Sequence, residues 1–273
     1  MRSFSYSPRE MLASPWRNRE LLFALLKRDV AGRYRGSFMG LAWSLFNPLL
    51  MLAIYTFVFS VVFKARWGAG EEGSRGDFAI VLFVGMIVHG LFTECVNRAP
   101  GLILAHANYV KKVIFPLDIL PWVAFGSALF HMAVGLAVLL AAQVVLRQYV
   151  PWTVVFFPIV LLPLVFATMG FAWLLASLGV YVRDVGQITA VFTLVLMFVS
   201  PVFYPVSALP PDYRRWLYLN PLTLVIEQSR GALLFGREPD FLQWSLLLAA
   251  SVLIAWGGFA WFQKTRRGFA DVV

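Results

Sequence analysis

The chain has 273 residues, of which 60% are hydrophobic and only 14% are charged, and its formal net charge is +9. This composition is typical of polytopic membrane proteins and excludes a soluble globular protein. The single cysteine, Cys95, excludes an internal disulfide. We interpret the positive charge as one that attracts anionic lipid headgroups and not nucleic acid, because the apolar runs described below leave no soluble basic surface.

A basic segment, residues 15–35, comes before the first long apolar run. Drawn as a helix, it gathers most of its charges on one side, while Asp29 and Arg33 intrude on the edge of the apolar side. We therefore predict an amphipathic helix that lies in the membrane interface and leads directly into a spanning helix. The predicted apolar side consists of Leu22, Phe23, Leu26, Val30 and Tyr34.

Six long runs are almost free of charge, and each can cross a bilayer, which takes about twenty helical residues. An even number of spans places both termini in one compartment. The segments on the side of the termini hold 15 lysines and arginines, against 8 on the other side, so both termini should be cytoplasmic. We predict an all-α polytopic fold that forms one membrane domain over residues 1–273. The runs are residues 36–63, 78–97, 119–146, 148–182, 185–211 and 241–263.

Two further segments are apolar yet unsuited to crossing the membrane. Residues 101–112 are too short and end in two lysines, so we expect one interfacial or protein-contacting helix there. Residues 200–235 contain five prolines, which break helical hydrogen bonding, so they should form short re-entrant helices that dip into the outer leaflet. Within this segment, Glu227 and Arg230 have the i, i+3 spacing of a helical ion pair.

The sequence lacks the motifs of several reaction classes. It has no Gly-x-x-x-x-Gly-Lys-Ser/Thr loop for nucleotide binding, and His89, His106 and His131 lack metal-ligand spacing. We therefore expect no catalytic residue, no metal site and no cofactor in this chain. Glu94 is the one acidic residue inside a predicted span, so it should have a partner or lie at the interface. A transporter with neither an ion relay nor an ATPase must obtain its energy from another subunit.

Several segments, taken in order, resemble the permease subunits of type-2 ABC exporters. Within that family the sequence is most similar to the polysaccharide-export branch, and there to O-antigen exporters. The resemblance implies a homodimer in the bacterial inner membrane with two copies of a separate subunit that binds ATP and Mg, and a lipid-linked polysaccharide as substrate. The segments are RYRGSFMGLAWSLFNPLLMLAIYTFVFS, NYVKKVIFPLDILP, YVRD, SPVFYPVSALP and NPLTLVIEQSRG.

The resemblance also implies roles for parts of the chain. Residues 101–112 would be a coupling helix, residues 200–235 would supply periplasmic gate helices with Glu227 and Arg230, and the first and fifth spans would line a channel. Contacts to the ATP-binding subunit would come from Ala107, Asn108, Tyr109, Lys111, Lys112, Arg183 and Asp184. Charges in cytoplasmic loops need no partner to explain them, so simple solvation is the alternative for Lys111, Lys112, Arg183 and Asp184.

Two groups of side chains suit a polysaccharide with a phosphorylated lipid. Arg28, Arg33 and Arg35 could bind its pyrophosphate, since guanidinium forms bidentate bonds to phosphate, or they could be an ordinary positive-inside anchor. Aromatic rings could let sugars slide through a channel by weak stacking, or they could face lipid. These aromatic residues are Tyr55, Phe57, Phe59, Phe192, Phe198, Phe203 and Tyr204.

Three alternatives stay open on the sequence. The exported polymer could be a capsule polysaccharide or a teichoic acid. The protein could instead be an ATP-independent lipid translocator or a membrane transferase. A transferase would need a constellation of acidic or histidine residues, for which only the scattered Glu94, Asp118 and Asp184 are available.

Overall fold

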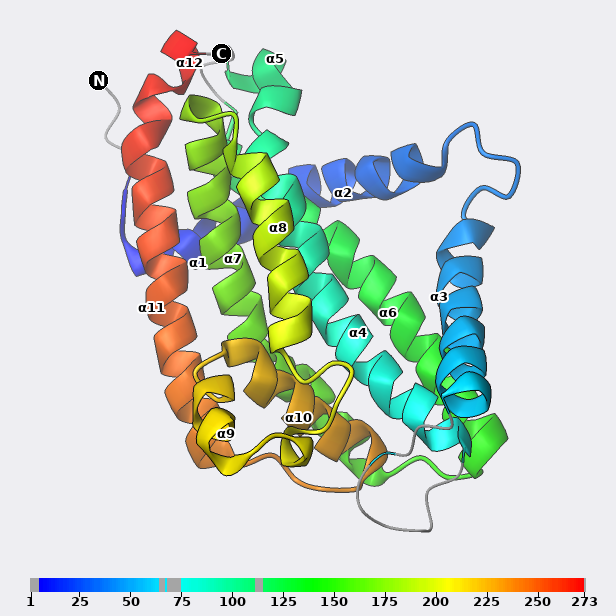
Figure 1. The fold of residues 1–273 in the computed structure, drawn as a ribbon. Coiled ribbons are helices and arrows are strands. Elements are labelled where there is room, and N and C mark those ends of the chain that lie inside the picture. The colour runs from blue at the N-terminus through cyan, green and yellow to red at the C-terminus, as the bar shows by residue number, and fades with distance from the viewer. Residues whose placement is uncertain (1–4, 64–66, 68–74, 111–114, 273) are drawn as a thin grey trace.

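The computed structural model describes residues 5–63, 67, 75–110 and 115–272. Its described part is an all-helical bundle (Figure 1), in which both termini lie at one end. We call this end the terminal face and the other end the distal face. The all-α prediction is confirmed.

Five helical stretches of the described chain are long and apolar enough to cross a membrane. The central one is α4, which has 78% of its most apolar stretch buried, whereas the corresponding stretch of α3 has 0%. These helices match five of the six predicted runs closely. They are α3 (Ala42–Tyr55) with a π-helical extension (Thr56–Val62), α4 (Arg75–Arg98), α6 (Leu120–Arg147), α7 (Phe157–Tyr181) after a 3-10 turn (Trp152–Phe156), and α11 (Phe241–Thr265).

The sixth predicted run, residues 185–211, is helical only in its first part. Helix α8 (Val185–Val199) has 15 residues, about 22 Å at 1.5 Å per residue, which is less than the hydrocarbon thickness of about 30 Å. The backbone becomes extended at Ser200, directly before Pro201. A 3-10 turn (Val206–Ala208), α9 (Pro211–Leu217) and α10 (Pro221–Leu234) then gather at the distal face (Figure 1).

The basic N-terminal segment forms two helices and not the one predicted for residues 15–35. Helix α1 (Pro8–Arg17) ends at Asn18, whose backbone leaves the helical region, and α2 (Arg19–Tyr34) begins after it. Helix α2 lies across the long helices near the terminal face (Figure 1), as expected of an interfacial helix. The predicted apolar side is partly wrong. The buried residue of α2 is Leu25, which is not part of the predicted side, and Phe23, which is part of it, is exposed.

The segment predicted as a single helix over residues 101–112 is a series of short turns. Two 3-10 turns (Ala99–Gly101 and Leu104–His106) lead into α5 (Ala107–Val110), which is a single α turn. Lys111 and Lys112 lie outside the described residues. These turns also lie at the terminal face (Figure 1).

Small residues bring α7 and α11 into direct backbone contact. A Cβ added at Gly258 would lie 2.1 Å from the carbonyl oxygen of Gly170, and one added at Gly170 would lie 2.6 Å from that of Ile254. Small residues are favoured at such helix interfaces in membranes because they let backbones approach closely. Trp173 and Phe259 then pack edge to face, with ring centres 5.1 Å apart.

A buried carboxylate ties both ends of the chain to the bundle. Asp118 accepts hydrogen bonds from Ser14 of α1 and from Nη1 of Arg266 beyond α11, the latter at 3.0 Å. Arg266 also donates to the carbonyl oxygen of Phe115 at 2.7 Å. A buried carboxylate is tolerated when it is paired and hydrogen-bonded in this way. The terminal face is thus held together by polar contacts between α1, α11 and the start of α6.

The α7–α11 interface predicts a contrast between two neighbouring glycines. Gly258→Ala should lower stability by about 1–3 kcal/mol, because the added methyl group meets backbone and the helices must separate. Gly257→Ala, whose Cβ would meet nothing within 4 Å, is the matched control and should be neutral or slightly stabilising. Thermal unfolding of the two variants in detergent measures the difference. Equal melting temperatures would contradict the close approach.

Candidate substrate-access site

Helix α2 is fastened to α4 by two ion pairs of opposite polarity. Asp29 of α2 accepts from Arg98 of α4 at 2.7 Å, and Arg33 of α2 pairs with Glu94 of α4 at 2.7 Å. Each helix contributes an acid and an arginine four residues apart, so each pair lies on one helical face. We call this arrangement the charge ladder. It attaches the interfacial helix to the central helix of the bundle.

A histidine of α6 joins the second rung of the ladder. Nδ1 of His131 lies 2.9 Å from Glu94, and Nε2 lies 2.9 Å from the hydroxyl of Tyr34. Nδ1 also lies 3.3 Å from Nη1 of Arg33, so the imidazole contacts both members of the Arg33–Glu94 pair. Burial raises the pKa of Tyr34, so its hydroxyl stays protonated beside the imidazole. The rung therefore links α2, α4 and α6.

The first rung stays charged because of its environment. Burial raises the pKa of Asp29, but the hydrogen bond and the positive charge of Arg98 outweigh burial, so the net pKa lies below its ordinary value. The Asp29 side chain is 24% exposed and that of Arg98 is 29% exposed, so water screens their attraction only in part. Asp29 is therefore ionised throughout the physiological pH range.

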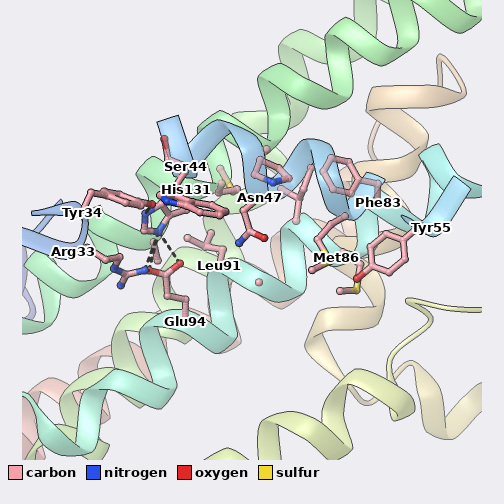
Figure 2. A pocket seen from close by; sticks show the side chains of 18 residues that line it. Arg33, Tyr34, Ser44, Asn47, Tyr55, Phe83, Met86, Leu91, Glu94 and His131 are labelled. Atoms are coloured by element: carbon pink, nitrogen blue, oxygen red, sulfur yellow. Dashed lines mark hydrogen bonds and ion pairs between the residues drawn. The ribbon is translucent and has the colours of Figure 1, made fainter. Parts of the chain in front are cut away.

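The ladder closes the polar end of a cavity of about 600 Å³ between α3, α4 and α6. Figure 2 shows Arg33, Tyr34, Glu94 and His131 gathered at one end of this cavity, with Tyr55 and Met86 at the other. Most of the remaining lining is apolar, from residues such as Leu91 and Met132. A concave, mostly apolar site with a few convergent polar groups is the usual form of a small-molecule pocket.

A second cavity of about 390 Å³ adjoins the first, and Arg33 lines both. Its lining is strongly basic, with Arg28, Arg33 and Arg98 against the single acid Asp29. His106 and apolar residues of α2 and α6 complete the wall. The two cavities together are amphiphilic: one is apolar along its length, and the other is cationic.

The three arginines predicted to meet substrate have different surroundings. Arg33 belongs to the charge ladder, and Arg28 donates to the Tyr109 hydroxyl at 2.8 Å. Arg35 is exposed, and within the described part of the chain no hydrogen bond or ion pair engages its side chain. Contact with phosphate stays a prediction for all three, and Arg35 is the best placed for it because no intramolecular partner competes.

The aromatic residues predicted to line a channel do not share one cavity in a single chain. Tyr55 lines the larger cavity, whereas Phe57 is exposed and Phe59 stacks on Phe78 with ring centres 5.1 Å apart. On and after α8, none of the predicted residues lines this cavity. Phe192 and Phe198 are exposed, the half-buried Phe203 stacks on Phe198, and the hydroxyl of the half-buried Tyr204 donates to the Phe198 carbonyl at 3.0 Å.

The residues predicted to contact an ATP-binding subunit lie together at the terminal face. Ala107, Asn108 and Tyr109 form α5, where Asn108 is exposed and Tyr109 stacks on Phe115 with ring centres 4.3 Å apart. Arg183 and Asp184 are exposed in the turn between α7 and α8, at the same end of the bundle. Their contact with a partner stays a prediction, as it does for Lys111 and Lys112.

The predicted gate residues form the expected ion pair. Nη1 of Arg230 lies 2.7 Å from Glu227 within α10. The Arg230 side chain is almost fully buried and also donates to the carbonyl oxygens of Val81 at 3.1 Å and Val202 at 2.9 Å. Its guanidinium lies 4.4 Å from the ring centre of Trp67. Arg230 thus ties α10 to α4 and to the turn that follows α8, while a gating role stays a prediction.

Comparison with known proteins identifies the family of the chain. The sequence profile described as "ABC-2 type transporter" matches residues 20–234, which include α2, the long helices up to α8, and α10. The chain therefore belongs to the ABC-2 type transporter family. It is a multi-pass membrane protein and a transport subunit.

Curated relatives cover nearly the whole chain. The O-antigen export system permease protein RfbA of Myxococcus xanthus is 29% identical over 93% of this chain and 96% of its own length. A protein of the same name from Klebsiella pneumoniae is 23% identical over 93% and 95%. The capsule polysaccharide export inner-membrane protein CtrC of Neisseria meningitidis is 23% identical over 88% and 89%. The similarity thus extends over the cavities and the charge ladder.

The sequence prediction missed the ladder, although a signal for it was present. Asp29 and Arg33 were noticed only as charges at the edge of an apolar side. Glu94 and Arg98 repeat the same spacing with the opposite order of signs. Two such complementary pairs, one on an interfacial helix and one at the end of a span, indicate partners, because charges near hydrocarbon require compensation.

The charge ladder predicts that Arg33 and Arg35 differ in their contribution to stability. Arg33→Glu places a second carboxylate beside Glu94, so it should lower the melting temperature by several degrees, and adding Glu94→Arg should restore much of the loss. Arg35→Glu should leave the melting temperature unchanged, because the side chain is exposed. Melting in detergent by intrinsic fluorescence checks both variants. Failure of the swapped pair to recover any stability would show that Arg33 and Glu94 are not partners.

Proposed function

We propose that this chain is the channel-forming subunit of an ATP-driven exporter that moves a lipid-linked, O-antigen-like polysaccharide out of the cytoplasm. The observation that carries this proposal is the similarity to O-antigen export permeases over 93% of the chain. The basic interfacial helix supports it, since a lipid-linked polymer presents phosphate beside hydrocarbon and arginine forms bidentate bonds to phosphate.

In this proposal the protein crosses the bacterial inner membrane six times with both termini in the cytoplasm. Helix α8 is the short span, and the excess of lysine and arginine at the terminal face gives the orientation. A span shorter than the bilayer is accommodated by local thinning or by association with other helices. A second copy of this chain would provide such an association.

The pathway for the polymer lies between two copies of the chain. Helices α3 and α8 carry large exposed apolar residues, including Phe57 on the extension of α3 and Phe198 on α8. In a homodimer these two helices would face each other and bring the aromatic groups of both chains together. Weak stacking of sugar faces on these rings would allow the polymer to slide.

Energy would come from two copies of a separate subunit that binds ATP and Mg. The chain itself has no recognisable nucleotide-binding loop. The docking surface would be α5 together with Arg183 and Asp184, which share the terminal face. The distal helices α9 and α10 would act as the periplasmic gate, with Arg230 holding α10 in place.

A capsule polysaccharide is the second candidate substrate, because a capsule export protein is also similar over most of the chain. A transferase is disfavoured by the surroundings of the three acids that it would use. Glu94 is paired with Arg33, and Asp118 is paired with Arg266 and buried. Asp184 is exposed in a turn, and the described residues contain no group of acids, histidines and cysteines that could hold a metal ion.

The docking surface can be tested with one bulky substitution. Asn108→Trp on the exposed side of α5 should reduce both surface polysaccharide and permease-stimulated ATP hydrolysis at least tenfold, because it blocks contact without disturbing the interior. Leu242→Trp, at an exposed position at the start of α11 near the distal face, is the control and should change neither. Lipid-linked polymer should accumulate inside cells that carry Asn108→Trp. Normal display and normal ATP hydrolysis with Asn108→Trp would rule out this docking surface, and normal display in a strain that lacks the chain would rule out the exporter itself.

The gate helices predict a pattern of protection and not uniform exposure. In a Cys95→Ser background, single cysteines at the buried positions 202, 206 and 217 should resist a membrane-impermeant thiol reagent added from outside. Cysteines at 216 and 219, where Trp216 and Leu219 are each 73% exposed, should react. Labelling that changes when ATP is hydrolysed would support a gate. Uniform labelling from residue 201 to residue 231 would instead show an ordinary external loop.

A further inference from the structure

The larger cavity is apolar along most of its length and lies between α3 and the rest of the bundle. Helix α3 is the least buried of the five long apolar helices. No residue of α3 is buried, and the cavity separates α3 from α4 and α6 at the level of Met51 and Leu91. An empty cavity of about 600 Å³ in this place would cost its lining the contacts that packed atoms provide. In a bilayer the surrounding hydrocarbon is available to fill it.

The depth of the cavity corresponds to one leaflet. Its lining on α3 runs from Trp43 to Tyr55, thirteen residues, or about 18 Å at a rise of 1.5 Å per residue. This is a little more than half of the hydrocarbon thickness of about 30 Å. Beyond Tyr55 the space is occupied by the stacked rings of Phe59 and Phe78. A single acyl chain of one leaflet fits this depth, whereas a longer isoprenoid tail exceeds it.

The polar end of the cavity suits an anionic headgroup. Arg33 connects the larger cavity with the smaller one, where Arg28 and Arg98 join it and Asp29 is the single acid. Nη1 of Arg98 is buried without a hydrogen-bond partner in the described part of the chain, so a donor is available to an anionic ligand. Basic pockets between spanning helices at the cytoplasmic side are typical sites for anionic lipid headgroups. A phosphate in the smaller cavity would meet three guanidinium groups.

We propose that the two cavities form one binding site for an anionic phospholipid, which belongs to the leaflet at the terminal face. One acyl chain fills the larger cavity beneath α3, and the phosphate lies in the smaller cavity among Arg28, Arg33 and Arg98. The lipid is a resident component that supports α3 against the bundle, and it is distinct from the exported polymer. This inference does not depend on the identity of that polymer.

Filling the cavity from the protein side tests the site. A Cβ added at Gly90, which lines the larger cavity, would meet nothing within 4 Å, so a side chain at this position begins in open space and Gly90→Leu directs it into the cavity. The full-length chain is purified in detergent, phosphatidylglycerol is added, and the bound lipid is counted by native mass spectrometry. Wild type should retain one phosphatidylglycerol per chain, and Gly90→Leu should retain at least fivefold less. Gly257→Leu on α11, which also enters open space but lies outside the cavity, should retain the wild-type amount.

The headgroup is tested separately. Arg28→Gln should weaken retention of phosphatidylglycerol, whereas Lys27→Gln removes a charge from the same helix without touching either cavity and should not. Phosphatidylcholine with the same acyl chains should be retained at least fivefold less than phosphatidylglycerol by the wild type. Equal retention of the two lipids would overturn the assignment of an anionic headgroup.

Two further outcomes would overturn the site itself. Unchanged retention in Gly90→Leu would place the lipid elsewhere, and a retained polyprenyl phosphate in place of phospholipid would make the cavity part of the substrate path. If Gly90→Leu does not fold, Met51→Trp fills the same space from the α3 side and is judged by the same fivefold criterion. Thermal unfolding of each variant separates loss of lipid from loss of fold.

Discussion

The arrangement of the terminal face depends on one constraint: a charged side chain at the edge of the hydrocarbon needs a partner of opposite sign. The chain meets this constraint with the charge ladder, in which Asp29 and Arg33 of α2 pair with Arg98 and Glu94 of α4. Because the signs alternate along both helices, only one register of α2 on α4 satisfies every charge. The ladder therefore fixes both the position and the direction of the interfacial helix.

Two consequences follow for the rest of the molecule. Helix α2 is held across the central helix, so the chain must turn through residues 35–41 before α3 can descend, and α3 stands off from α4 and α6. The gap becomes a cavity whose polar end is the ladder itself. A single set of ion pairs thus positions the interfacial helix and also forms one wall of the cavity.

Helix positions followed from the sequence wherever hydrophobicity alone decides them. The predicted run at residues 119–146 and the observed α6 (Leu120–Arg147) differ by one residue at each end, because loss of apolar character and loss of helix coincide there. Within residues 185–211 the apolar run extends past the helix, which ends at Val199 before Pro201, in agreement with the predicted break by the prolines of residues 200–235. Apolar character predicts burial or contact with lipid, whereas backbone chemistry decides whether a helix continues.

The site was less predictable, because it depends on pairs that are distant in sequence. In the sequence Arg33 is a cation that could meet substrate, yet its contacts with Glu94 and His131 depend on how α2 packs against α4 and α6. The same holds for the aromatic residues, since Tyr55 lines a cavity and Phe57 does not, although both lie in one helical stretch. Which face of a helix is covered follows from tertiary packing and not from residue type.

The most direct test is a double-mutant cycle on the first rung of the ladder. Asp29→Asn, Arg98→Gln and the double variant are compared with wild type by reversible unfolding in detergent. We predict a coupling free energy of about 0.6 kcal/mol and at most about 1.7 kcal/mol, the average and the maximum for hydrogen-bonded side-chain pairs in a membrane protein. Strictly additive effects of the two substitutions would show that Asp29 and Arg98 do not interact, and the fixed position of α2 would then lack its physical cause.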